Sequence, residues 1–132
     1  FSIHDMTLVI IGNLIKGEKI NYKNIIHIGP IDINYIYGYL KQSNGLINSS
    51  KSEGMSISIL EAMKLKCPVY VRNNNGNKSI VNDYYNGFIF NNPNEFYFKS
   101  KLNTNEIIKN AFRYVNTIHN IYIEKIKYIN IL

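Results

Sequence analysis

The stretch that decides the fold is residues 45–71, GLINSSKSEGMSISILEAMKLKCPVYV. It opens on a short apolar run at 45–48, passes through a small polar loop, and continues with a dense apolar pattern at 55–66. A second apolar run follows at 68–71. Short apolar runs without polar alternation are typical of strands buried on both faces, and the longer pattern between them is typical of a helix. The stretch therefore predicts a strand–helix–strand unit with parallel strands.

The same alternation extends outward in both directions. Further strands are predicted at 7–11, 25–28 and 87–90, and further helices at 34–42, near 77–83, and from about 94 onward. This order predicts the α/β class, with a Rossmann-like open parallel sheet and helices on both faces. Ligands of such sheets bind beyond the carboxyl ends of the strands.

Length and composition fit one globular domain over 1–132, with 98–132 as a C-terminal helical segment. Apolar residues make up 45% of the chain and charged residues 18%, which excludes wholesale disorder. No apolar run approaches the roughly 18–20 residues of a membrane span, so no transmembrane segment is predicted. The single cysteine, Cys67, excludes a disulfide framework and fits a reducing compartment, so we expect a cytoplasmic location.

The net charge of +6 favours an anionic partner. The basic residues are spread along the chain, and the only arginines are Arg72 and Arg113, so we do not expect nucleic acid as the partner. The chain's three histidines share no metal-like spacing, and no metal site is predicted.

The loop before the central helix carries the most specific signals. It contains Gly54, and it leads into a helix whose first N–H groups have no partner within the helix. This geometry suits a phosphate group. The alternative is an ordinary strand–loop–helix connection, in which small polar residues are normal.

Glu61 adds a second signal. The pattern at 57–65 is apolar nearly all round, which predicts a buried helix with Glu61 among apolar neighbours. A buried carboxylate needs a partner, which is either a lysine or arginine of the protein or the hydroxyl groups of a ligand. Glu53 stands eight positions earlier, about 12 Å away if the spacing were helical, so the two acids could grip two parts of one long ligand.

Glu53 and Glu61 form an E-x7-E pattern within a longer ordered set of motifs. The set comprises 8–12 (LVIIG), 28–29 (IG), 52–55 (SEGM), 60–63 (LEAM), 67–69 (CPV) and 86–90 (NGFIF). In order and spacing it resembles the retaining glycosyltransferases of the GT-B fold, in family 4 or glycosyl transferases group 1. The resemblance implies the C-terminal, nucleotide-sugar-binding half of such an enzyme, with the N-terminal acceptor-binding domain absent from this chain.

The resemblance also implies a role for each site residue. Glu53 would be the catalytic residue beside the transferred sugar, and Glu61 would hold the ribose hydroxyls. The other donor-binding residues would be Gly54, Met55 and Ser56 at the sugar, Ile57 and Ser58 at the diphosphate, Ile28 and Gly29 at the base, and Gly76 and Asn77 along the donor side.

The implied reaction needs no metal or other cofactor, because helix N–H groups and fixed cations can stabilise a leaving nucleoside diphosphate. Aspartate occurs only at Asp5, Asp32 and Asp83, so the Asp-x-Asp motif of metal-dependent enzymes is missing. The family's diphosphate-clamping Arg and Lys would lie upstream of the first strand, outside this chain. The chain by itself is therefore expected to be inactive, and the acceptor is unknown.

Two alternatives stay open on the same scaffold. One is a non-catalytic nucleotide-sugar-binding or regulatory module. The other is a nucleotide-sugar epimerase of the GT-B fold.

Overall fold

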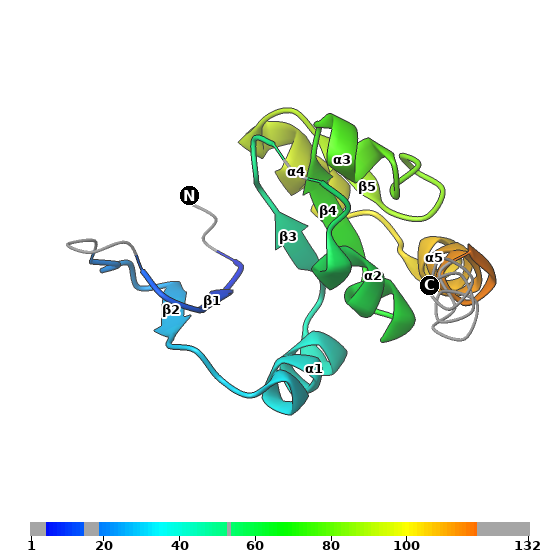
Figure 1. Cartoon of the computed structure of the whole chain (residues 1–132). Helices are drawn as coiled ribbons and strands as arrows, with labels where there is room; N and C mark the ends of the chain where they lie inside the picture. Colours follow the sequence, from blue (N-terminus) through cyan, green and yellow to red (C-terminus); the bar gives the residue numbers. More distant parts are fainter. Residues whose placement is uncertain (1–4, 15–18, 53, 119–132) are drawn as a thin grey trace. The chain divides into compact units, whose positions relative to one another are not determined.

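The structure is a computed structural model that describes residues 5–14, 19–52 and 54–118. Its chain separates into two compact units, residues 1–39 and 40–132, and each is considered by itself. The elements in chain order are β1 (Leu8–Ile11), β2 (Ile25–Ile28), α1 (Ile33–Gln42), β3 (Leu46–Asn48), α2 (Ile57–Lys64), β4 (Val69–Arg72), α3 (Asn75–Lys78), β5 (Phe88–Phe90), α4 (Pro93–Ser100) and α5 (Asn105–Ile118) (Figure 1).

Every strand pair within residues 5–14, 19–52 and 54–118 is parallel, so the predicted α/β class is confirmed. In the first unit β1 pairs with β2, and in the second unit the strand order is β3-β4-β5. Each predicted strand lies within one residue of the observed bounds. The single-domain assignment of 1–132 stays a prediction.

Two helix predictions are wrong in their bounds. The short helix expected near 77–83 is α3, which begins earlier because Asn74 caps it by accepting a hydrogen bond from the Asn77 N–H at 2.8 Å. The helix expected from about 94 onward is interrupted, since α4 ends at Ser100 and α5 begins at Asn105. After this break the Asn103 side chain accepts from the Asn105 N–H at 2.9 Å, at the start of α5. The predicted helical segment beyond residue 118 lies outside the described residues.

The core of the second unit is built around β4. This strand lies between β3 and β5, and its residues Val69, Tyr70 and Val71 are all buried. The Tyr70 ring stacks on Phe88 with 5.3 Å between centroids and meets Phe96 of α4 edge-on at 5.5 Å. Helix α2 contacts β3 and β4, and α5 packs against α2. The apolar run at 68–71 therefore lacks polar alternation because both of its faces are covered.

A buried lysine ties α4 to the segment that precedes β5. The Lys99 Nζ donates to the Asp83 Oδ2 at 2.8 Å and to the Ile89 carbonyl, and it lies 4.6 Å from the centre of the Tyr84 ring. The Asp83 Oδ1 accepts from the Ile89 N–H at 2.8 Å. One ion pair thus connects α4, β5 and the segment at 82–84.

The first prediction concerns the packing of Gly87 against β4. A methyl group at Gly87 would lie 2.7 Å from the Val69 Cγ2 and 2.9 Å from the Val81 Cγ1, so Gly87→Ala should lower the free energy of unfolding by about 1–3 kcal/mol. Gly54→Ala is the matched control, because nothing lies within 4 Å of a methyl group there. Urea denaturation measures both variants, and equal losses would contradict the packing argument.

The second prediction concerns the Lys99–Asp83 ion pair, in which the two side chains are 9% and 35% exposed. Lys99→Met leaves the Asp83 carboxylate and the Ile89 carbonyl without their cation and should cost about 2 kcal/mol of unfolding free energy. Lys109→Met is the control, since the Lys109–Glu106 pair is 68% and 78% exposed and its loss should cost less than about 0.5 kcal/mol. Thermal unfolding that does not separate the two variants would refute this ranking.

Candidate functional site

Within the described part of the chain, no side chain caps the N-terminus of α2. Ser56 occupies the cap position, but its hydroxyl makes no capping hydrogen bond and instead lies 2.9 Å from the Ser58 hydroxyl. The first turn of α2 also carries no acidic residue. Because the first N–H groups of a helix have no partner within it, this end presents N–H donors and the positive end of the helix dipole. Such an end can bind an anion.

The residues around this helix start face away from the core, with Ser56 as the exception. Met55 is 57% exposed and Ile57 is 68% exposed, and Ser58 is exposed as well. Gly54 is exposed, with open space where a Cβ would stand. A ligand could therefore approach the Gly54 backbone closely. Among residues 54–58, Ser56 alone is buried.

The prediction that α2 is buried all round is wrong. Its buried face consists of Ile59, Ala62 and Met63, whereas Glu61 is only half-buried. Glu61 follows Ile57 by four positions, so the two share one side of the helix. The sheet and α5 cover the other side, and this explains why an apolar pattern all round the helix does not bury every residue in it. Glu61 thus lies one turn along the same open side that begins at the uncapped N-terminus.

The two residues expected on the donor side lie in α3. Gly76 is half-buried there, and Asn77 is fully buried. The Asn77 Nδ2 donates to the Arg72 carbonyl at 2.9 Å and makes a longer contact of 3.5 Å with the Asn48 Oδ1. In this arrangement the Asn77 side chain points into the protein, which the sequence pattern had not indicated.

Three predicted site residues, Glu53, Ile28 and Gly29, are not part of α2 or α3 as the structure describes them. Glu53 lies outside the described residues. Ile28 ends β2 in the first unit, where its carbonyl accepts from the Gly12 N–H at 3.0 Å, and Gly29 after it is exposed. The structure therefore brings together the segment 54–58 and Glu61, and the donor-binding and catalytic roles of all these residues stay predictions.

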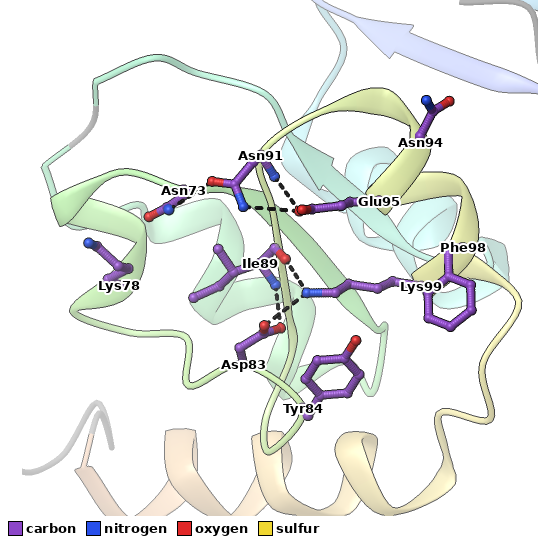
Figure 2. A pocket seen from close by; sticks show the side chains of 10 residues that line it. All are labelled: Asn73, Lys78, Asp83, Tyr84, Ile89, Asn91, Asn94, Glu95, Phe98 and Lys99. Atoms are coloured by element: carbon purple, nitrogen blue, oxygen red, sulfur yellow. Dashed lines mark hydrogen bonds and ion pairs between the residues drawn. The ribbon is translucent and has the colours of Figure 1, made fainter.

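A cavity of about 710 Å³ lies elsewhere in the second unit, between the segment at 82–84, β5 and α4 (Figure 2). Its charged groups largely pair with neighbours within the wall. Lys99 binds Asp83, and the Glu95 carboxylate accepts from the Asn91 N–H at 2.8 Å and from its side-chain amide at 3.0 Å. These hydrogen bonds from Asn91 lower the pKa of Glu95. The sequence pattern gave no signal for this cavity, and its paired charges serve the fold.

The thiol of Cys67 is part of the packed core. Cys67 is buried beside the Ser43 hydroxyl at 3.4 Å, and burial raises the pKa of its thiol, which makes it a poor nucleophile. Among residues 5–14, 19–52 and 54–118, no three His, Cys, Asp or Glu side chains gather as they would around a metal ion. Over the same residues, no helix combines the length and apolar character needed to cross a membrane.

Comparison with known sequences identifies the family. The family model for glycosyl transferases group 1 matches residues 2–118. The chain is 43% identical over 95 residues to a "Glycosyltransferase 1 domain-containing protein 1" of Xenopus tropicalis, an alignment covering 67% of this chain and 28% of that protein. It is 33% identical over 94 residues to the "UDP-Gal:alpha-D-GlcNAc-diphosphoundecaprenol alpha-1,3-galactosyltransferase" of Escherichia coli, covering 66% and 24%. The chain thus spans about a quarter of the length of these relatives.

Solved structures show the same fold. The C-terminal domain of a glycosyl transferase group 1 family protein (LpcC) from Francisella tularensis aligns with a TM-score of 0.61 and 28% identity, over 75% of this chain and 55% of that one. The pneumococcal O-GlcNAc transferase GtfA, solved in complex with UDP and GlcNAc, aligns with a TM-score of 0.59 over 80% of this chain and 23% of that one. Its identity of 19% supports the fold alone.

The open start of α2, the parallel strands and the match over 2–118 agree with one another. On this evidence, the chain belongs to the glycosyl transferases group 1 family.

Proposed function

We propose that this chain is the C-terminal, donor-binding domain of a retaining GT-B glycosyltransferase of family 4. The enzyme transfers a sugar from a nucleotide-diphosphate sugar to an acceptor bound by an N-terminal domain of the same polypeptide. The observation that carries the proposal is the uncapped, solvent-facing N-terminus of α2, with Glu61 one turn further along the same side. Membership of the glycosyl transferases group 1 family supports it.

The diphosphate of the donor binds at the start of α2. The N–H groups at Ile57 and Ser58 point out of the helix end, and the first turn holds no carboxylate to repel a phosphate. The net charge of +6 also favours an anionic donor. When the sugar leaves, negative charge grows on the diphosphate, and fixed N–H dipoles stabilise that charge without a metal.

The two acids of the E-x7-E pattern act on either side of the diphosphate. Glu61 accepts hydrogen bonds from the ribose hydroxyls, since a carboxylate on the open side of α2 can bind two adjacent hydroxyl groups. Glu53 lies beside the transferred sugar as the catalytic residue. The backbone of Gly54, Met55 and Ser56 contacts the sugar hydroxyls, and the exposure of Gly54 supports a close backbone approach.

The other predicted contacts belong to the same proposal. Ile28 and Gly29 contact the base, and Gly76 lines the donor side. Since the Asn77 side chain is buried, its contribution is to hold the surrounding loops. A cytoplasmic location also remains a proposal, supported by the single cysteine of the chain.

The third prediction tests the role of Glu61. In saturation-transfer NMR the chain should contact UDP or GDP and their sugars, and Glu61→Ala should weaken the binding of that nucleotide about tenfold or more, because it removes charged hydrogen bonds to the ribose. Glu61→Gln should lie between the two, since an amide keeps one acceptor oxygen. Glu106→Gln, at an exposed position of α5, is the control and should bind like the unaltered chain.

Two results would overturn the proposed function. One is the absence of saturation transfer to every nucleotide and nucleotide sugar tried. The other is nucleotide contact of equal strength in the unaltered chain and in Glu61→Ala.

A further inference from the structure

Two asparagines, Asn74 at the N-cap of α3 and Asn77 within this helix, hold the loop that leaves β3. The Asn74 Nδ2 donates to the Ser50 carbonyl at 2.9 Å, across 24 positions of sequence. The Asn77 Nδ2 donates to the Arg72 carbonyl at 2.9 Å and lies 3.5 Å from the Asn48 Oδ1. The Asn48 Oδ1 in turn accepts from the Ser50 N–H at 3.1 Å. We call these four residues, Asn48, Ser50, Asn74 and Asn77, the asparagine clamp.

The orientation of the Asn77 amide follows from its surroundings. Both acceptors near this side chain face its nitrogen, and a flipped amide would place its oxygen against the Arg72 carbonyl. In the present orientation the Asn77 Oδ1 is buried and has no hydrogen-bond partner among the described residues. A buried acceptor without a partner is costly. The Asn77 side chain therefore keeps its two Nδ2 hydrogen bonds and leaves its Oδ1 without a partner among the described residues.

Capping alone does not explain Asn74. Asn92 caps α4 in the same way, since its side chain accepts from the Glu95 N–H at 3.0 Å and its backbone angles of −149° and 166° match the −148° and 165° of Asn74. Within the described residues the Asn92 side chain makes only this cap, whereas Asn74 also uses its amide nitrogen to reach Ser50. The additional hydrogen bond, from the Asn74 Nδ2 to the Ser50 carbonyl, therefore serves to hold the loop beyond β3.

This loop runs straight into the proposed donor site. It leaves β3 at Asn48 and reaches the start of α2 at Ile57. On the way, Gly54 has no neighbour near its Cβ position and Met55 is 57% exposed, so little packing holds the part next to α2. The asparagine clamp therefore fixes the position of residues 48–50, from which the loop continues to α2.

From this geometry we infer that Asn74 and Asn77 are positioning residues for the nucleotide-sugar donor. By holding residues 48–50 against α3, they place the loop so that its backbone and the N-terminus of α2 face the same ligand. A loop ordered before binding loses less conformational entropy when the ligand arrives. This inference rests on the proposed function and assigns it residues that do not themselves touch the donor.

The fourth prediction uses Asn74 and Asn92 as a matched pair. Asp and Ser both cap helices about as well as Asn, so Asn74→Asp and Asn74→Ser keep the cap of α3 and lose the bond to Ser50. The affinity for UDP, or for GDP if that is the nucleotide bound, should fall about fivefold in both, as expected for the loss of one partly buried hydrogen bond. Asn92→Asp and Asn92→Ser should leave the affinity unchanged.

Two further readouts separate positioning from general loss of stability. The melting temperature of each Asn74 variant should stay within a few degrees of its Asn92 counterpart. Backbone amide shifts and hydrogen exchange in the free protein should change at 49–56 in the Asn74 variants and stay unchanged in the Asn92 variants. If Asn74→Asp is poorly folded because its new charge faces the Ser50 carbonyl, Asn74→Ser, which adds no charge, decides the test.

The outcomes distinguish this inference from the proposed function. If the unaltered chain binds neither UDP nor GDP, the proposed function fails and the inference fails with it. If the unaltered chain binds a nucleotide and the Asn74 variants bind it as tightly as the Asn92 variants, only the inference is overturned. Weaker binding with matched melting temperatures and altered loop amides supports both.

Discussion

The burial of β4 is the constraint on which the second unit depends. Val69, Tyr70 and Val71 lie between two parallel neighbours and under covering helices, so this strand cannot shift without exposing the centre of the core. Since β3, β4 and β5 are parallel, their carboxyl ends meet at one edge of the sheet. The loops after β3 and β4, which carry the donor-site segment and α3, therefore start from neighbouring positions. The hydrogen bond between Asn74 and Ser50 becomes possible because of this alignment.

The polar groups of this unit fall into two classes. Some are buried and mostly satisfied by the protein itself. Lys99 binds Asp83 and a carbonyl, and Asn86 donates to the Ile80 carbonyl at 3.0 Å and accepts from the Asn82 N–H at 2.7 Å. The start of α2 differs from these sites, because none of the described side chains caps it and the residues on either side of the cap position are exposed. Buried networks of the first class stabilise loops, whereas a helix start of the second class is available to a ligand.

The helices of the second unit show how far the sequence could predict the structure. The pattern at 57–65 correctly indicated a helix, because hydrophobic periodicity reports local structure. It did not predict that Glu61 and Ile57 would lie on an open side, because exposure depends on what packs against the helix. The helix that packs against α2 is α5, which lies more than 40 residues later in the chain. The helical pattern also did not reveal the interruption between α4 and α5, where the Asn103 side chain bonds to the Asn105 N–H. Asn77 also looked like a donor-side residue, whereas its Nδ2 turns inward to the Arg72 carbonyl.

By itself, the sequence determined the α/β class, the places of the strands to within one residue, and the ordered motifs that indicate the glycosyl transferases group 1 family. These properties follow from local periodicity and from residues close together in the chain. Only the tertiary structure decided which side of α2 is open and that Lys99 pairs with Asp83 in the cavity wall beside α4. It also decided that Asn74, before α3, holds the loop beyond β3. The second and third of these depend on hydrogen bonds between residues 16 and 24 positions apart, and the first depends on the packing of α5 and the sheet against α2. Such contacts exist only once the fold brings the segments together.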